Sequence, residues 1–336
     1  MAAIKIAPQD GPQTTFLSTS ADIAFYGGAA GGGKSFALLL EPLRHATTVT
    51  GFGAVIFRRE SPQITNEGGM WDESEKLYLH FGAKPTRSPK LSWSFPPYGN
   101  SITFSHMQHE KDRHAWQGAQ VPFIGFDELT HFTRKQFFYM LSRNRSACGV
   151  NPYVRATYNP VPNDDPIGGW IHEFVGWYLD DNGEYPDMDK AGIVRWFVNS
   201  SDTLHWFASE EEARVTYPSI DPKSFTYIPA FVQDNKILLE KNPQYLANLY
   251  ALGEVEQERL LHANHKVKAQ AGKIFSREWF PVVDSLPLPI LDTVRFWDFA
   301  ATEKKRTKGA ATASVKMGKM SDGRYIILDV TEDFIG

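Results

Sequence analysis

A chain of 336 residues is long for one domain and suggests two, or one large domain with an added piece. Its 42% hydrophobic and 13% aromatic content excludes a disordered protein, and a net charge of -4 gives no global basic signature, so contact with a nucleic acid would need local positive charge. The single cysteine, Cys148, excludes an intrachain disulfide framework and fits a reducing cytoplasm, and no apolar run is long enough to span a bilayer.

Residues 7–20 begin with turn formers and continue into a short helical stretch ahead of the first predicted strand. Gln13 stands out here because a glutamine amide can donate to and accept from the N6 and N7 edge of adenine. A solvated loop glutamine is the alternative interpretation, and only the loop that follows favours a contact with adenine.

Residues 23–40, IAFYGGAAGGGKSFALLL, combine an apolar strand pattern, a glycine-dense turn and the start of a helical pattern over 36–48. The turn fits G-x-x-x-x-G-K-[ST] at every fixed position. Glycines let backbone N–H groups approach phosphate oxygens closely, the lysine supplies a charge for the β- and γ-phosphates, and the serine hydroxyl is a ligand for Mg²⁺. A flexible Gly/Ala loop is the alternative. The predicted phosphate-binding residues are Gly28, Ala29, Ala30, Gly31, Gly32, Gly33, Lys34 and Ser35.

The next predicted strand, 52–59, ends in Arg58 and Arg59. Parallel sheets place such strand ends at the ligand edge, so either arginine could face phosphate or DNA. A surface ion pair with Glu60 or Glu67 is an equal alternative. Residues 71–81 then predict an amphipathic helix, and residues 92–107 predict two strands around a Pro-Pro turn.

A further apolar strand pattern, VPFIGF, ends in Asp127 and Glu128. A P-loop NTPase needs such acids beside its phosphate loop: the first would hold Mg²⁺ through water, and the second would orient and deprotonate the attacking water. The alternative is a helix N-cap, because the following residues look helical. The phosphate loop upstream favours the catalytic interpretation.

Three further residues are candidates for roles around the γ-phosphate. Arg113, in the loop before the acidic strand, is a candidate arginine finger for the same or a neighbouring subunit's nucleotide. Thr157 and Asn159 end the strand pattern 153–160, where short polar groups can sense the γ-phosphate and pass its loss onward. Without the other motifs, this stretch would be a strand and a turn.

In this order, GPQTTFLSTSADIAFYGGAAGGGKS, VIFRRESPQI, FIGFDELTHF and ATYNP resemble the ATPase of tailed-phage large terminase subunits, the motors that package DNA into procapsids. Residues 224–235 and 243–252 are similar to the stretch that follows the ATPase core in that family. The resemblance covers nearly the whole chain. It implies an α/β P-loop NTPase fold with a central, mainly parallel sheet flanked by helices.

The resemblance also implies roles for single residues: Gln13 reads adenine, Lys34 and Ser35 bind phosphate and Mg²⁺, Asp127 positions the metal, Glu128 is the catalytic base, Thr157 and Asn159 belong to a coupling motif, and Arg113 is an arginine finger. It divides the chain into an ATPase core over 1–160, the rest of the ATPase domain with a lid over 161–285, and a nuclease segment over 286–336. We expect a helix from about 243 to 263. Residues 260–265, LLHANH, depart from the family, which commonly has Gly-Asp-Trp after Leu-Leu.

Strand patterns over 293–302, 311–317 and 325–330 follow a proline linker and resemble the start of an RNase H-like nuclease. Such a site holds two metal ions, Mg²⁺ or Mn²⁺, with several carboxylates. Asp298 would be the first of them, and Asp329 lies on a later strand, but the family's second acid comes beyond Gly336. We therefore expect an incomplete nuclease that is partly disordered and does not cut DNA.

The sequence thus predicts an ATPase that powers translocation of double-stranded viral DNA in the cytoplasm of an infected host, with no membrane contact. Its expected partners are a small terminase subunit, the portal and procapsid, and further copies of itself in a ring on the portal. One alternative is a helicase or recombination-type ATPase, which would share the phosphate loop and acids but not the WDFA segment at 297–300. Another is a non-hydrolysing assembly module that binds nucleotide as a structural element.

Overall fold

The computed structural model describes residues 6–267, 281–283, 285, 288–299 and 312–333. The chain divides into two units, residues 1–269 and 270–336, and each is described by itself. The finer predicted division at residues 160 and 285 stays a prediction. Among the described residues, no helix is both long and apolar enough to cross a membrane.

The first unit is built on a ten-stranded sheet in the order β3-β4-β5-β2-β6-β7-β1-β10-β8-β9. The run from β5 to β10 is parallel throughout, and an antiparallel strand pair continues the sheet at each edge. The strands are β1 (Ile23–Gly28), β2 (Gly53–Arg58), β3 (Lys84–Thr86), β4 (Leu91–Phe95), β5 (Asn100–His106), β6 (Phe123–Phe126), β7 (Tyr153–Tyr158), β8 (Arg195–Ser200), β9 (Thr203–Phe207) and β10 (Lys223–Ala230).

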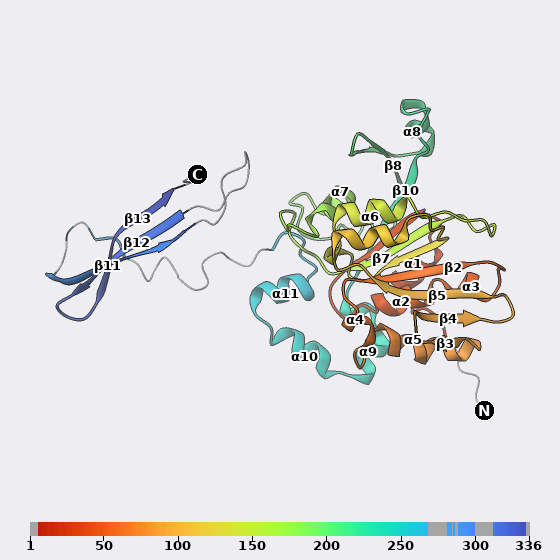
Figure 1. The fold of residues 1–336 in the computed structure, drawn as a ribbon, viewed down its shortest axis with the longest axis horizontal. Helices are drawn as coiled ribbons and strands as arrows, with labels where there is room; N and C mark the ends of the chain where they lie inside the picture. Colours follow the sequence, from red (N-terminus) through yellow and green to blue (C-terminus); the bar gives the residue numbers. More distant parts are fainter. Residues whose placement is uncertain (1–5, 268–280, 284, 286–287, 300–311, 334–336) are drawn as a thin grey trace. The chain divides into compact units, whose positions relative to one another are not determined.

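Helices cover both faces of this sheet (Figure 1). The α-helices are α1 (Pro12–Ser18), α2 (Lys34–Leu40), α3 (Leu43–Ala46), α4 (Pro62–Thr65), α5 (Met70–Tyr78), α6 (Arg134–Leu141), α7 (His172–Val175), α8 (Glu210–Thr216), α9 (Lys236–Lys241), α10 (Gln244–Tyr250) and α11 (Glu254–Leu260). The 3₁₀ turns are η1 (Leu79–Phe81), η2 (Glu110–Trp116), η3 (Leu129–His131), η4 (Gly169–Ile171), η5 (Gly176–Tyr178) and η6 (Val232–Asp234).

Successive side chains of β1 point to opposite faces of the sheet, and each face packs against helices. Phe25 packs in a core cluster with Phe137 of α6 and Phe174 of α7, whereas its neighbour Tyr26 packs in a cluster with Ala37 of α2. Every residue of β1 is buried, as expected of a central parallel strand whose two faces are both covered. The expected α/β fold with a mainly parallel sheet is confirmed.

The parallel strands also place their carboxyl ends at one edge of the sheet. β1 runs into the phosphate loop, residues 28–33, here called the glycine loop. β6 ends just before Asp127, and β7 ends just before Asn159. β7 lies between β1 and β6, so its end separates the phosphate loop from the acidic pair. The order of the parallel strands therefore determines which residues meet at the functional site.

Two predicted helices are broken in the structure. The helix expected over 36–48 is split into α2 and α3, because Pro42 lacks the N–H that a continuous helix would need there. The helix expected over 243–263 is split into α10 and α11, with the low-propensity residue Gly253 as the N-cap of α11. The prediction of one continuous helix was wrong in both regions.

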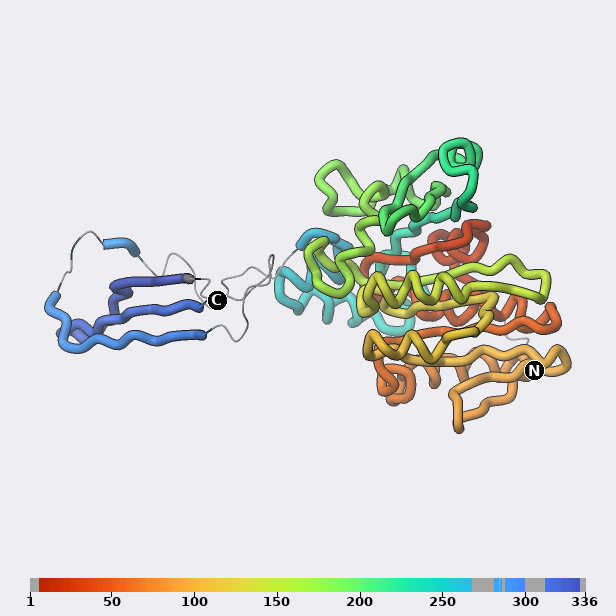
Figure 2. Tube along the Cα trace, turned by 45° about the horizontal axis from the view of Figure 1, so that its top comes forward, coloured from red at the N-terminus to blue at the C-terminus, as the bar shows by residue number. Residues whose placement is uncertain are grey.

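The second unit contains a three-stranded antiparallel sheet in the order β11-β12-β13. Its strands are β11 (Ile290–Asp298), β12 (Thr312–Met320) and β13 (Tyr325–Asp333), which run side by side at the blue end of the chain in Figure 2. The basic loop between β11 and β12 lies outside the described residues. Phe296 and Val294 are largely exposed on β11.

Candidate functional site

A cavity of about 420 Å³ lies at the carboxyl edge of the sheet. The glycine loop with the start of α2 forms one wall, and Arg58, Asp127, Glu128 and Asn159 come from the ends of β2, β6 and β7. The loop between α4 and α5 and residues Asn235 and Leu238 contribute further lining. The cavity brings together the phosphate loop, the acidic pair and one member of the predicted coupling motif.

The glycine loop holds conformations that other residues rarely adopt. Gly28, Gly31 and Gly33 have φ values of 139°, 76° and 72°, which favour glycine. A Cβ on Gly28 would also lie 2.4 Å from the Ala230 carbonyl oxygen. The loop shape therefore depends on glycine at these positions, as the motif predicts.

The Lys34 ammonium lies inside the loop. Nζ donates to the carbonyl oxygens of Ala29 and Gly28, the latter at 3.4 Å, and to Oδ1 of Asn159 at 3.0 Å. Burial lowers the pKa of Lys34 to about 8, and the nearby carboxylates of Glu128 and Asp127 oppose that shift. A cation held this way can exchange its neutral partners for phosphate oxygens.

The Asp127 carboxylate is fully buried and is contacted from three elements. Its Oδ1 accepts hydrogen bonds from the Ser35 hydroxyl at 3.0 Å and from the Thr157 hydroxyl, while its Oδ2 lies 2.6 Å from an Arg58 nitrogen. Arg58 therefore pairs with neither Glu60 nor Glu67, and the surface ion pair that the sequence allowed is wrong. Arg59 points elsewhere and donates to Gln136 and to the Met107 carbonyl.

Glu128 has a left-handed backbone, with φ 59° and ψ 60°. Non-glycine residues in this region are uncommon and concentrate at functional sites. Both carboxylate oxygens accept from the Asn159 amide nitrogen, at 3.0 and 3.2 Å. Because the same side chain accepts from Lys34, Asn159 bridges the lysine and the acid.

Gln13 and Arg113 are not among the residues that line this cavity. The Gln13 amide is buried against the loop, where Nε2 donates to the Gly33 carbonyl and Oε1 accepts from the Gln9 backbone. Arg113, on η2, pairs with Glu110 and lies over the ring of Tyr139. Their predicted roles with adenine and γ-phosphate stay predictions.

Sequence reasoning assigned no role to residues after β10 that contact the glycine loop. The Asn235 amide donates to the Gly31 carbonyl at 2.7 Å, and the Leu260 carbonyl accepts from the Ala30 N–H at 2.7 Å. The ring of Tyr245 occupies the place where a Cβ on Gly31 would stand. No local motif marks these residues, because their role depends on how α9 to α11 return to the loop.

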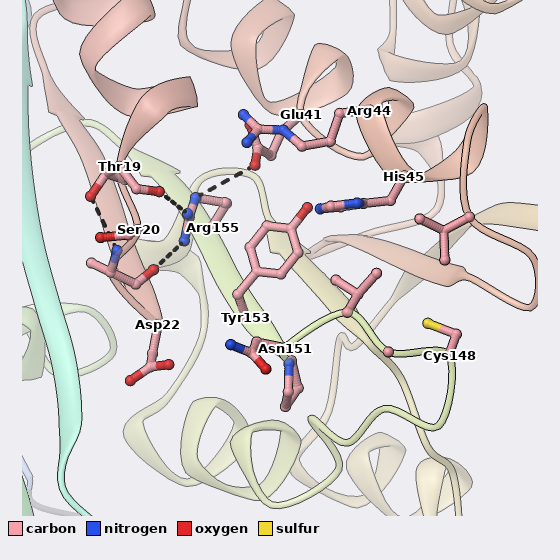
Figure 3. Close-up of a pocket in the computed structure, with 15 residues that line it drawn as sticks. Thr19, Ser20, Asp22, Glu41, Arg44, His45, Cys148, Asn151, Tyr153 and Arg155 are labelled. Atoms are coloured by element: carbon pink, nitrogen blue, oxygen red, sulfur yellow. Dashed lines mark hydrogen bonds and ion pairs between the residues drawn. The ribbon is translucent and has the colours of Figure 1, made fainter.

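A second cavity, of about 500 Å³, lies beside the C-terminal end of α2 (Figure 3). Its buried Arg155 donates to the carbonyls of Thr19 and Ala21 and lies 3.9 Å from the buried Glu41 carboxylate. Burial raises the pKa of Glu41, although Arg155 and Arg44 oppose the shift. These charges compensate one another, as buried charges must, at the sheet edge opposite the glycine loop.

A glycine loop between a strand and a helix, with an acidic pair at a nearby parallel strand end, defines a P-loop nucleoside triphosphatase. The family model described as terminase large subunit, T4likevirus-type, N-terminal, matches residues 25–282. The chain therefore belongs to the terminase large subunit family.

The fold is similar to that of one solved large terminase, and two further terminase structures match with lower scores. The large terminase of a thermophilic bacteriophage is similar with a TM-score of 0.51 and 12% identity, over 97% of this chain and 68% of that one. The large terminase of bacteriophage HK97 matches with a TM-score of 0.44 and 16% identity, over 96% of this chain and 62% of that one. The large terminase ATPase domain of Thermus phage P74-26 matches with a TM-score of 0.45 and 12% identity, over 78% and 100%. No curated protein sequence shows significant similarity to the chain.

Proposed function

We propose that the chain hydrolyses ATP to drive double-stranded DNA into a viral procapsid, as the motor of a terminase. Membership of the terminase large subunit family supports the packaging part of the proposal. One geometric observation carries the chemical part: Lys34, Asp127, Glu128 and Asn159 from the glycine loop and two strand ends meet around one cavity.

Each residue has a distinct task in the proposed reaction. The loop N–H groups and the Lys34 ammonium bind the phosphates, and Glu128 accepts a proton from the attacking water as the new oxygen–phosphorus bond forms. ADP leaves as the γ-phosphoryl bond breaks. Because Asn159 contacts both Lys34 and Glu128, a γ-phosphate that draws Lys34 away also frees the amide to reorient the acid.

The same cavity fits a magnesium ion. The Ser35 hydroxyl and the Asp127 carboxylate offer two hard oxygen ligands whose atoms lie 3.0 Å apart, and Mg²⁺ typically takes few protein oxygens and completes its shell with water and phosphate. Ser35 and Asp127 are therefore the residues that would hold it. When bound, Mg²⁺ neutralises charge on the phosphate oxygens.

Replacing Glu128 by glutamine tests the enzyme proposal. Glu128→Gln preserves shape but removes the base, so we expect hydrolysis to fall by at least about 100-fold, a typical loss for a general base, while nucleotide binding persists. Phosphate release and binding of a fluorescent ATP analogue measure the two quantities. Glu67→Gln, an exposed acid before α5, is the control. Unchanged turnover in Glu128→Gln would mean that the chain is a non-hydrolysing nucleotide-binding module.

The proposed partners are double-stranded DNA, a small terminase subunit, the portal with its procapsid, and further copies of the chain in a ring. Stimulation of hydrolysis by the small subunit or by portal-bearing procapsids would separate this proposal from a helicase or recombination-type ATPase. DNA stimulation alone would not, because both classes respond to DNA. We place the activity in the cytoplasm of an infected host.

We further propose that residues 1–160 form the ATPase core, that 161–285 complete it with a lid, and that 286–336 belong to an RNase H-like nuclease. Asp298 ends β11 and would be a ligand of the nuclease metal ions, Mg²⁺ or Mn²⁺. Asp329, on β13, is instead paired with Arg295. DNA cleavage that requires Mn²⁺ and that Asp298→Ala abolishes would show a working nuclease site in this chain.

A further inference from the structure

Residues 260–265, here called the strap, leave α11 and run across the carboxyl edge of the sheet. At its start, the Leu260 carbonyl accepts from the Ala30 N–H of the glycine loop at 2.7 Å. At its end, the His265 N–H donates to the Glu184 carbonyl at 2.7 Å, and the His265 side chain is fully buried. Between them, Ala263 has φ 59°, a conformation that costs free energy unless the surroundings enforce it.

The imidazole of His265 makes two hydrogen bonds whose direction can be assigned. Nδ1 lies 2.9 Å from the Ala263 carbonyl oxygen, which can only accept, so Nδ1 carries the proton. Nε2 is then an acceptor, and the Tyr158 hydroxyl, 3.0 Å away, donates to it. Burial lowers the pKa of His265 to about 3, so the ring stays neutral at physiological pH, and the two hydrogen bonds select its tautomer.

Tyr158 is the residue between the two members of the predicted coupling motif. Thr157 donates to Asp127, and Asn159 bridges Glu128 and Lys34, whereas Tyr158 points to the opposite face of β7, as strand alternation requires. Its ring lies against β1: a Cβ on Gly27 would stand 2.0 Å from it. The Tyr158 side chain thus fixes the backbone from which both coupling side chains project.

We propose that Tyr158 and His265 are a positioning pair for the ATPase reaction, and this inference rests on the proposed function. The hydrogen bond between them ties the end of β7 to the strap, and the strap is tied to the glycine loop through Leu260 and Ala30. The positions of Asn159 and Glu128 relative to the glycine loop therefore depend on a hydrogen bond outside the cavity, the one between Tyr158 and His265. Neither residue lines the cavity, so the pair should act on turnover rather than on affinity.

Tyr158→Phe tests the proposal, because it keeps the ring against Gly27 and removes only the hydroxyl. Small misplacement of catalytic groups costs up to about 100-fold in rate, and we expect kcat to fall by roughly 10- to 100-fold, with KM and nucleotide binding within about twofold of wild type. The matched control is Tyr178→Phe, which removes a buried hydroxyl bonded to the carbonyls of Ile193 and Phe225, away from the cavity. Both variants lose a buried hydrogen bond, but only Tyr158→Phe should lose turnover.

Substitutions of His265 provide a second test. Glutamine places an acceptor near the Nε2 position and asparagine does not, so His265→Gln should retain more of kcat than His265→Asn. Equal kcat in Tyr158→Phe and Tyr178→Phe, in a wild-type background that hydrolyses ATP, would overturn the positioning pair and leave the proposed function intact. A wild-type protein that does not hydrolyse ATP would overturn the function itself.

Discussion

Lys34 carries the charge that phosphate binding needs, and its burial makes that charge sensitive to pH. The folded, nucleotide-free protein has the Lys34 pKa at about 8, well below the ordinary 10.5. Between those values the unfolded chain binds more protons, so the stability of the nucleotide-free protein should rise with pH in that window. Phosphate binding reverses the shift, because the bound anion favours the charged ammonium.

We therefore expect ATP affinity to fall as pH rises above 8, by up to about tenfold per pH unit, and binding at pH 8.5 to take up protons. Calorimetry in two buffers of different ionisation enthalpy measures that uptake. Lys34→Arg is the control. Its guanidinium stays charged over this pH range, so ATP binding to the variant should neither release nor take up a proton at residue 34. An affinity that stays constant from about pH 7 to 9.5 in the wild type would contradict the assignment.

At the residue scale, the sequence predicted which side chains meet but not all of their partners. The loop motif and the acidic strand end place Lys34 and Asp127 together because parallel strands end at a common edge. The pairing of Arg58 with Asp127 was not predictable, since it depends on which of two successive arginines faces the cavity. Alternation in β2 decides this, and its register is visible only in the sheet.

At the element scale, the sequence predicted strands with strong apolar runs and missed weaker ones. β1, β2 and β6 are continuous buried runs, whereas β8 and β9 are half-buried strands at one side of the sheet with mixed polar residues. Strands near a sheet edge show a weaker hydrophobic pattern in their sequence, because they have fewer neighbours to pack against. The segment that carries β8 and β9 therefore shows no strand pattern as clear as those of β1, β2 and β6, whereas β10 is a continuous buried strand that the sequence analysis did not predict.

Gly27 in β1 shows how strand packing constrains a single position. Its backbone is in the ordinary range, so a substitution meets only steric resistance from the Tyr158 ring, 2.0 Å from the place that a Cβ would take. We expect Gly27→Ala to destabilise the protein by about 1–3 kcal/mol, the usual cost of overpacking. Urea unfolding measures the change.

Gly53→Ala is the matched control for that measurement, because Gly53 begins β2 of the same sheet and no atom lies within 4 Å of its Cβ position. It should change stability by less than about 0.5 kcal/mol, as substitutions without steric conflict usually do. An equally small loss of stability in Gly27→Ala and Gly53→Ala would show that the Tyr158 ring moves aside freely. The packing of Tyr158 on β1 would then be too loose to fix the end of β7.

At the scale of the whole molecule, the nucleotide cavity and Arg113 raise the question of a partner subunit. Arg113 lies on η2, held by Glu110 and the Tyr139 ring, and it is not among the residues that line the cavity of its own chain. A transition state of phosphoryl transfer gains charge that an arginine stabilises, in cis or in trans. If Arg113 serves that purpose, a neighbouring copy in a ring is the natural recipient.

Mixing two inactive variants tests this arrangement. Glu128→Gln keeps Arg113 but lacks the base, and Arg113→Ala keeps the base but lacks the arginine, so a mixed oligomer contains sites that receive both groups. We expect each variant alone to lose at least about 100-fold in turnover and the mixture to recover activity, because an arginine finger contributes about 10³–10⁵ to kcat. Arg145→Ala, whose guanidinium donates to the Ala119 carbonyl on the surface, should behave as wild type. A mixture as inactive as its components, under conditions in which the wild type assembles, would exclude supply of Arg113 by a neighbouring copy. Wild-type turnover in Arg113→Ala alone would remove Arg113 from the reaction and leave Arg58, already 2.6 Å from Asp127, as the arginine at the site.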